Sequence, residues 1–181
     1  DPNMFWYEPT KEWILVLAHP LEHEMLIFAS PDLTHWQQRG SFGKGLGCQN
    51  GIWECPDLFE LPVDGTGQKK WVFLVNLNPG NPFGGSGTQY FTGTFDGTTF
   101  TPDKDADGTV PTKWMDWGKD NYASVSFSDA PDGRRVLLGW MSNWEYADRV
   151  PTRQFRSANT LPRDMSLFTG DDGRLYMAGA P

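Results

Sequence analysis

Short apolar runs alternate with clusters of turn-forming residues along the whole chain. Val, Ile, Leu and aromatic residues dominate the runs, and Gly, Pro, Asp and Asn dominate the stretches between them. No stretch of twelve residues repeats apolar positions with the 3.6-residue period of a helix. The sequence therefore predicts an all-β fold, with its clearest strands at residues 13–18, 25–30, 71–77, 89–95, 122–127, 135–140 and 174–178.

A loose internal repeat groups these strands. A polar turn, a basic or polar lead-in and an apolar strand recur in PTKEWILVLA, GQKKWVFLVN, DGRRVLLGWM and DGRLYMAGA. Repeated four-stranded units are typical of propeller blades. A β-sandwich or a jelly roll produces similar strand spacing, so the pattern alone leaves both architectures open. We predict one domain over residues 1–181.

Charge and composition exclude several classes of protein. The net charge of −8 argues against a nucleic-acid partner, which a basic patch would favour. No apolar run approaches the roughly 18 residues that a membrane span needs. Cys48 and Cys55 form neither a CxxC pair nor a disulfide framework, and His19, His23 and His35 lack a metal-ligand spacing. We therefore expect no membrane partner, no metal and no organic cofactor.

The segment Trp53-Glu54-Cys55-Pro56-Asp57 places one acid among apolar neighbours. Apolar surroundings favour the protonated form of a carboxyl group, which a general acid requires near neutral pH. Pro56 has no N–H, so we expect ladder pairing to end there and Glu54 to lie at a strand end beside a loop. A surface glutamate in a turn is the alternative that composition alone favours.

Nine tryptophans provide candidate stacking surfaces for sugars. Most are expected in the core. The better candidates are Trp140 and Trp144 in GWMSNW and Trp114 and Trp117 in WMDWG, because Asp, Asn and Ser are dense around them.

Several segments together resemble one known family. WECPDLFELPVDG, at residues 53–65, resembles the acid/base segment of glycoside hydrolase family 32, which includes invertases, levanases and inulinases. DPNMFWYEPTKEWILVLA resembles the family segment that begins Arg-Asp-Pro. Further stretches resemble the family in the family's order: GGSGTQYFTGTFDGTTF, DWGKDNYASVSF, LLGWMSNWEYADRVPT and FRSANTLPRDMSL. The resemblance covers essentially the whole chain.

This resemblance implies a five-bladed β-propeller whose funnel holds three carboxylates. Glu54 would be the general acid/base. Asp1 would be the aspartate of the Arg-Asp-Pro motif, which binds fructosyl hydroxyls and stabilises the transition state. Trp140 would line the fructose subsite, and Asp120 and Tyr122 match an Asp-x-Tyr-Ala segment near the substrate. Trp53, which precedes Glu54, is a further candidate. The substrate-binding candidates are therefore Trp53, Asp120, Tyr122 and Trp140.

The chain also departs from the family pattern. Nothing matches the Trp-Met-Asn-Asp-Pro-Asn-type motif that carries the family's nucleophile upstream of Arg-Asp-Pro, and no Arg precedes Asp1. The family's downstream β-sandwich is missing too. We therefore interpret residues 1–181 as an incomplete propeller, and we expect them alone to be inactive and poorly folded because open strand edges stay unpaired.

The implied activity is release of terminal fructose from the β-fructans levan and inulin, and from sucrose, by a retaining two-carboxylate mechanism. An invertase or a fructosyltransferase of the same family is an alternative, since only substrate or acceptor differs. A non-catalytic carbohydrate-binding propeller and a structural β-domain are the rivals from other classes. The size of fructan polymers implies a secreted protein. The sequence leaves the preferred linkage, exo or endo action and the oligomeric state open.

Overall fold

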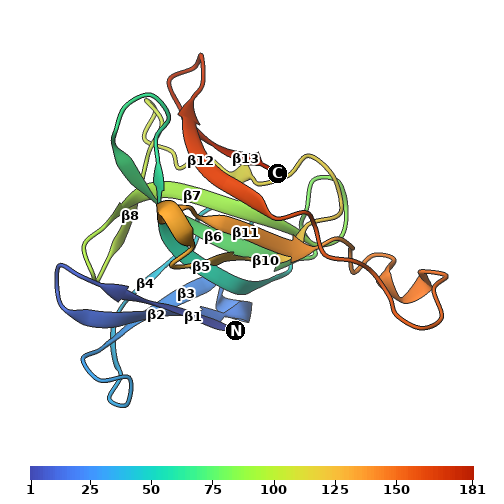
Figure 1. The fold of residues 1–181 in the computed structure, drawn as a ribbon, viewed down its shortest axis with the longest axis horizontal. Coiled ribbons are helices and arrows are strands. Elements are labelled where there is room, and N and C mark those ends of the chain that lie inside the picture. The colour runs from blue at the N-terminus through green and yellow to red at the C-terminus, as the bar shows by residue number, and fades with distance from the viewer.

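The computed structural model describes all 181 residues, and Figure 1 shows β-strands as their main regular secondary structure, joined by turns and loops. The only helices are three single 3-10 turns, at Pro20–Glu22, Pro131–Gly133 and Ala147–Arg149. None of them has the length or the apolar character that crossing a membrane requires.

The strands form three antiparallel sheets in chain order. The first contains β1 (Pro2–Tyr7), β2 (Glu12–His19), β3 (Glu24–Ser30) and β4 (Gln37–Phe42). The second contains β5 (Ile52–Pro62), β6 (Lys69–Asn78), β7 (Gly87–Phe95) and β8 (Phe100–Pro102), and β9 (Lys113–Trp114) also pairs with β7. The third contains β10 (Tyr122–Phe127), β11 (Val136–Trp140), β12 (Arg163–Thr169) and β13 (Leu175–Ala180).

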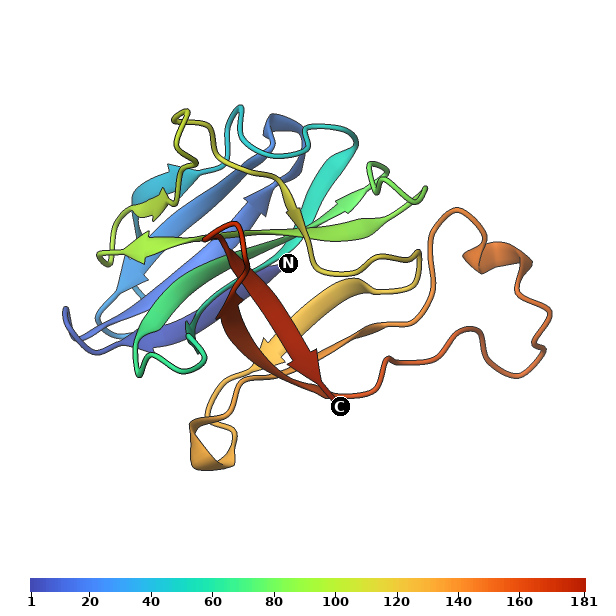
Figure 2. The same cartoon turned by 90° about the horizontal axis from the view of Figure 1, so that it is seen from above.

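Each sheet is a meander in which consecutive strands pair, which is the architecture of a propeller blade. Figure 2 shows the three sheets fanned out side by side, with a long loop between β11 and β12 projecting from the third. The prediction of an all-β chain forming part of a propeller is confirmed.

All seven predicted strands are present, and four of the strands that were not predicted have a physical explanation. β4 is the outermost strand of its sheet and exposes most of its polar side chains, so it contains no apolar run. β8 and β9 are too short to show a period. In β12 only Met165 and Leu167 are buried, and polar Ser166 separates them, so no apolar run marks the strand.

The second sheet is buried on both faces because it packs between the other two. Along β6, Phe73, Val75 and Leu77 join a core cluster shared with the first sheet. The intervening Val72 and Leu74 join a second cluster shared with the third sheet. This period of two is the side-chain alternation of a strand, and it explains why the apolar run of β6 is continuous.

Aromatic rings fill the layer between the first and second sheets. Phe42 stacks on Phe73 with ring centroids 5.1 Å apart, and it meets Phe91 and Phe100 edge-on at 5.0 and 4.8 Å. All four side chains are buried. Offset and edge-to-face pairs of this kind stabilise a core beyond the area that they bury.

The second and third sheets are also joined by a buried acid. Asp57 of β5 accepts hydrogen bonds from the backbone N–H of Ser126 at 2.7 Å and from its hydroxyl at 2.6 Å. Burial raises the pKa of Asp57 to about 6, although the bonds from Ser126 and the nearby Arg135 act in the opposite direction. The carboxyl group is therefore protonated in the folded chain at a pH where it is ionised in the unfolded chain.

We predict that Asp57 makes stability fall as the pH rises from 4 to 7. The folded state keeps this proton to a pH of about 6, and the unfolded state releases it near the ordinary pKa of 3.8. Relative to Asp57→Asn, which cannot titrate, the free energy of unfolding of the wild type should drop by roughly 2 kcal/mol across this range. Urea unfolding of the full-length protein at a series of pH values measures the difference.

The matched control for this experiment is Asp148→Asn, because the Asp148 side chain is 84% exposed. Its stability curve should run parallel to that of the wild type. A parallel curve for Asp57→Asn as well would show that burial does not retain the proton.

Candidate active site

A bulge in β5 sets the direction of Glu54. In the pairing of β5 with β6, Glu54 lies opposite Asn76 and Asp57 lies opposite Leu74, so two residues of β5 face the single residue between them on β6. Cys55 adopts a φ of 42° at this point. Bulges of this kind are common beside active sites, where they redirect a side chain.

The expectation that pairing ends at Pro56 is therefore wrong. β5 continues to Pro62, and Pro56 lies in the bulge. Because the extra residue of a bulge makes no regular ladder bond, the missing N–H of proline causes no loss there. The strand remains paired with β6 on both sides of the bulge.

Tyr122 is the direct partner of Glu54. The phenol O–H donates a hydrogen bond to the Glu54 carboxylate from the start of β10, in the neighbouring sheet. Tyr122 is buried whereas Glu54 is half-buried. Burial and the adjacent carboxylate both raise the pKa of Tyr122 above its ordinary value, so the phenol stays a neutral donor.

Asn76 holds the bulge in place. Its side-chain amide donates to the carbonyl of Cys55 at 2.8 Å, and its carbonyl oxygen accepts from the hydroxyl of Thr88 at 2.6 Å and the N–H of Ser124 at 3.2 Å. Asn76 has no exposed area. The sequence analysis missed this residue, although a single Asn inside the apolar run of residues 71–77 was a readable signal.

Asp1 lies beside the same bulge. The thiol of Cys55 donates to the Asp1 carboxylate at 3.4 Å, so the acids at positions 1 and 54 flank one cysteine. Burial and the Glu54 carboxylate raise the pKa of the Cys55 thiol, which keeps it protonated. Cys55 and Cys48 are both free, so neither takes part in a disulfide.

An aromatic wall extends from Tyr122. The centroid of the Trp140 ring lies 6.5 Å from that of the Tyr122 ring, and the Trp144 ring lies 5.0 Å from the Trp140 ring. Trp144 is 58% exposed, so the wall opens to solvent. Tyr122 and Trp140 face each other in the β10–β11 pairing, which places Trp140 on the Glu54 side of the third sheet.

Trp53 does not lie on this wall, and its prediction as a substrate-binding residue is wrong. Its ring has no exposed area and belongs to the core between the first two sheets. The indole N–H donates to the carbonyl of Cys48 at 2.9 Å. A Cβ on Gly43 would lie 2.2 Å from the ring, so this glycine is needed for the close approach. The strand alternation turns Trp53 inward where it turns Glu54 outward.

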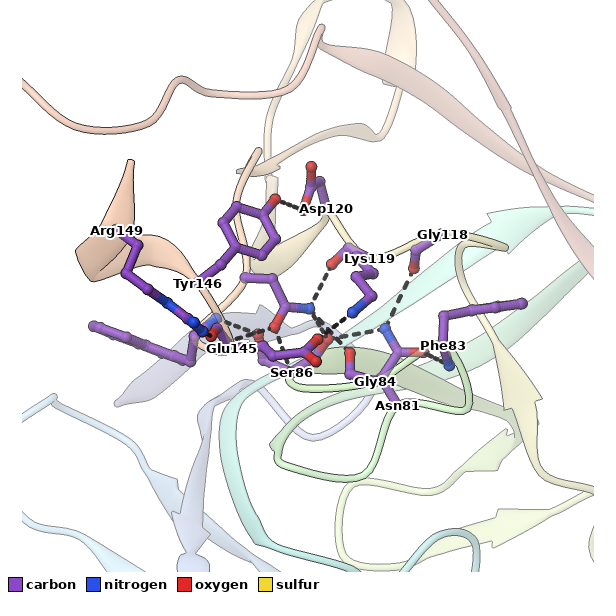
Figure 3. Close-up of polar contacts among 12 residues, drawn as sticks. Asn81, Phe83, Gly84, Ser86, Gly118, Lys119, Asp120, Glu145, Tyr146 and Arg149 are labelled. Carbon is purple, nitrogen blue, oxygen red and sulfur yellow. Dashed lines mark hydrogen bonds and ion pairs between the residues drawn. The ribbon is translucent and has the colours of Figure 1, made fainter. Parts of the chain in front are cut away.

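Asp120 lies at the rim and not against Glu54. Figure 3 shows the Tyr146 phenol pointing at Asp120, to which it donates a hydrogen bond. Partial burial and this carboxylate raise the pKa of Tyr146 to about 12. Asp120 therefore joins the loop after β9 to the loop after β11.

A buried amide ties the loops around this rim together. Asn143 donates to the carbonyls of Ser86 and Lys119 at 3.0 and 2.9 Å, and accepts from the N–H of Glu145 at 2.9 Å. Figure 3 shows how Ser86, Lys119 and Glu145 converge from three different connections. Asn143 has no exposed area, and no local pattern of residues signals its role.

The structure contains no group of three or more His, Cys, Asp or Glu side chains that could hold a metal ion. His23 contacts the carbonyl of Gly51, while His19 and His35 are largely exposed at other places. The chemistry that this arrangement supports on its own is proton transfer by Glu54, beside a neutral phenol and a neutral thiol.

Comparison with known proteins matches the whole chain. The model of the glycosyl hydrolases family 32 N-terminal domain matches residues 1–179. A levanase from Bacillus subtilis is 49% identical over 96% of this chain and 25% of its own length. An extracellular exo-inulinase from Aspergillus niger is 44% identical over 93% of this chain and 32% of its own length.

Solved structures show the same similarity. The β-fructofuranosidase from Schwanniomyces occidentalis, complexed with fructosyl-erythritol, superposes with a TM-score of 0.93 at 38% identity, over 100% of this chain and 35% of its own. The exo-inulinase from Aspergillus awamori gives 0.91 at 41% identity, with the same coverage. The chain thus spans a quarter to about a third of the relatives' lengths. It belongs to glycosyl hydrolase family 32, within the N-terminal domain of that family.

Proposed function

We propose that the protein is a glycoside hydrolase that releases terminal fructose from β-fructans and from sucrose, with Glu54 as general acid/base. The observation that carries the proposal is the placement of Glu54 at a bulge of β5, hydrogen-bonded to Tyr122 and next to Cys55, which contacts Asp1. The relatives named levanase, exo-inulinase and β-fructofuranosidase support the substrate class.

In this mechanism Glu54 protonates the oxygen of the leaving group while a second carboxylate attacks the anomeric carbon. Glu54 then removes a proton from the water that hydrolyses the covalent intermediate, which returns the starting protonation state. Retention requires the two carboxyl groups to be about 5–5.5 Å apart. We propose that Asp1 binds fructosyl hydroxyls and is not the nucleophile, which the family carries in a segment that these residues do not match.

The remaining candidates have separate roles in the proposal. Trp140 offers an aromatic face to the fructosyl ring beside Tyr122, and Asp120 accepts hydrogen bonds at the rim. We also propose that the protein is secreted, since fructans are polymers and the Aspergillus niger relative is named extracellular.

We predict that Glu54→Gln lowers fructose release from levan, inulin and sucrose by about a thousandfold, because general acid–base catalysis contributes roughly 10²–10⁴ in rate. Chromatography of the products measures it. A fructoside whose leaving group needs no proton should lose much less activity. Glu60→Gln is the matched control, since Glu60 is exposed on the same strand. Equal activity of Glu54→Gln and wild type would contradict the assignment.

The products distinguish related activities in the same experiment. Fructose as the first product indicates an exo-acting hydrolase. Short oligosaccharides in its place would indicate endo action or fructosyl transfer. Absence of any product from the three substrates would contradict the proposed function as a whole.

We also predict that Tyr122→Phe lowers kcat for sucrose about tenfold and leaves KM nearly unchanged. The phenol is the direct hydrogen-bond partner that positions the Glu54 carboxyl group, and such a bond is worth roughly 1.5 kcal/mol. Initial-rate kinetics measures both constants. Tyr146→Phe removes a phenol that contacts Asp120 instead, so its kcat should fall much less. An unchanged kcat in Tyr122→Phe would show that this bond does not position Glu54.

A further inference from the structure

Exposed aromatic side chains border a trough between the second and third sheets, away from Glu54. Trp117 is 81% exposed and Phe168 is 42% exposed. A hollow of about 420 Å³ lies between them, and a second of about 200 Å³ adjoins it through shared walls. The walls shared by both hollows are Tyr90, Trp114, Trp117 and Tyr176. None of the candidate residues around Glu54 lines either hollow.

Three of the aromatic walls are tied to the fold. Tyr90 of β7 accepts a hydrogen bond from the backbone N–H of Met177 in β13 at 3.0 Å, which joins the two sheets at the floor of the trough. The rings of Phe168 and Tyr176 lie 5.8 Å apart on paired strands. These contacts form within the chain itself, so a ligand would not have to order Tyr90, Phe168 and Tyr176.

Polar groups of both signs line the same trough. Arg174 is bonded to Asp105 at 2.7 Å, and Tyr176 donates to Asp172 at 2.7 Å. Lys113 is buried and forms no ion pair, and its ammonium donates to the hydroxyl of Thr92 at 3.1 Å. A lysine ammonium has three N–H donors, so Lys113 keeps donor capacity beside the hollow.

We propose that this trough is a second carbohydrate-binding site, which holds part of a fructan chain away from Glu54. Flat aromatic faces next to hydrogen-bonding groups are what the C–H faces and hydroxyls of a sugar require. A purely apolar partner would leave the remaining N–H donors of Lys113 unpaired, and the mixed charges favour a neutral ligand over an anion. The choice of fructan rests on the proposed function.

Affinity electrophoresis of the full-length protein in gels containing levan or inulin tests this site. The Glu54→Gln background prevents hydrolysis, and excess sucrose occupies the Glu54 site. Trp117→Ala should weaken the remaining retardation about tenfold, equivalent to roughly 1.4 kcal/mol, and Phe168→Ala should weaken it too. Phe155→Ala is the matched control, because Phe155 is 68% exposed outside the trough. In the active protein, Trp117→Ala should hydrolyse sucrose at the wild-type rate.

Equal retardation of Trp117→Ala and Phe155→Ala would overturn the second site, as would a parent protein that neither fructan retards. Near-ultraviolet circular dichroism confirms that each variant is folded. Retardation that depends on Trp117, in a protein that releases no fructose from any substrate, would support the trough while removing the proposed catalytic function.

Discussion

The constraint on which the rest of the structure depends is that the second sheet has no solvent-facing side. Both faces of β6 are covered from Val72 to Leu77, one by each neighbouring sheet, so each of these positions must fit a packed environment. Toward the end of β6 the series of side chains that face the third sheet changes from Val72 and Leu74 to Asn76. The candidate site begins where this buried layer becomes polar.

At that point the local chemistry consists of neutral donors directed at acids. A phenol and a thiol bond to Glu54 and Asp1, and neither carboxylate forms an ion pair in the chain. The phenol and the thiol thus complete hydrogen bonds of the two acids without adding a charge beside them.

The fold class was predictable from the sequence, because strand periodicity is a local property. The resemblance to the family pointed to Glu54 and Tyr122, but not to the place of Glu54 within its strand. The bulge was not predictable, since Pro56 signals a strand end as readily as an irregularity in a continuing strand. The orientation of Trp53 depends on which face of β5 meets the first sheet, and the role of Asn143 depends on loops brought together only by the fold. Both depend on tertiary structure, which local sequence patterns do not specify.

The amide of Asn143 has a consequence for how the rim can vary. It joins the connections β6–β7, β9–β10 and β11–β12, so a length change near Ser86 or Lys119 would disturb the other two connections. Beyond Glu145, most of the β11–β12 loop lies outside this hydrogen-bond network and projects from the domain. Insertions are therefore tolerated best in the projecting part of this loop, where the chain can vary in length without disturbing the three connections that Asn143 joins.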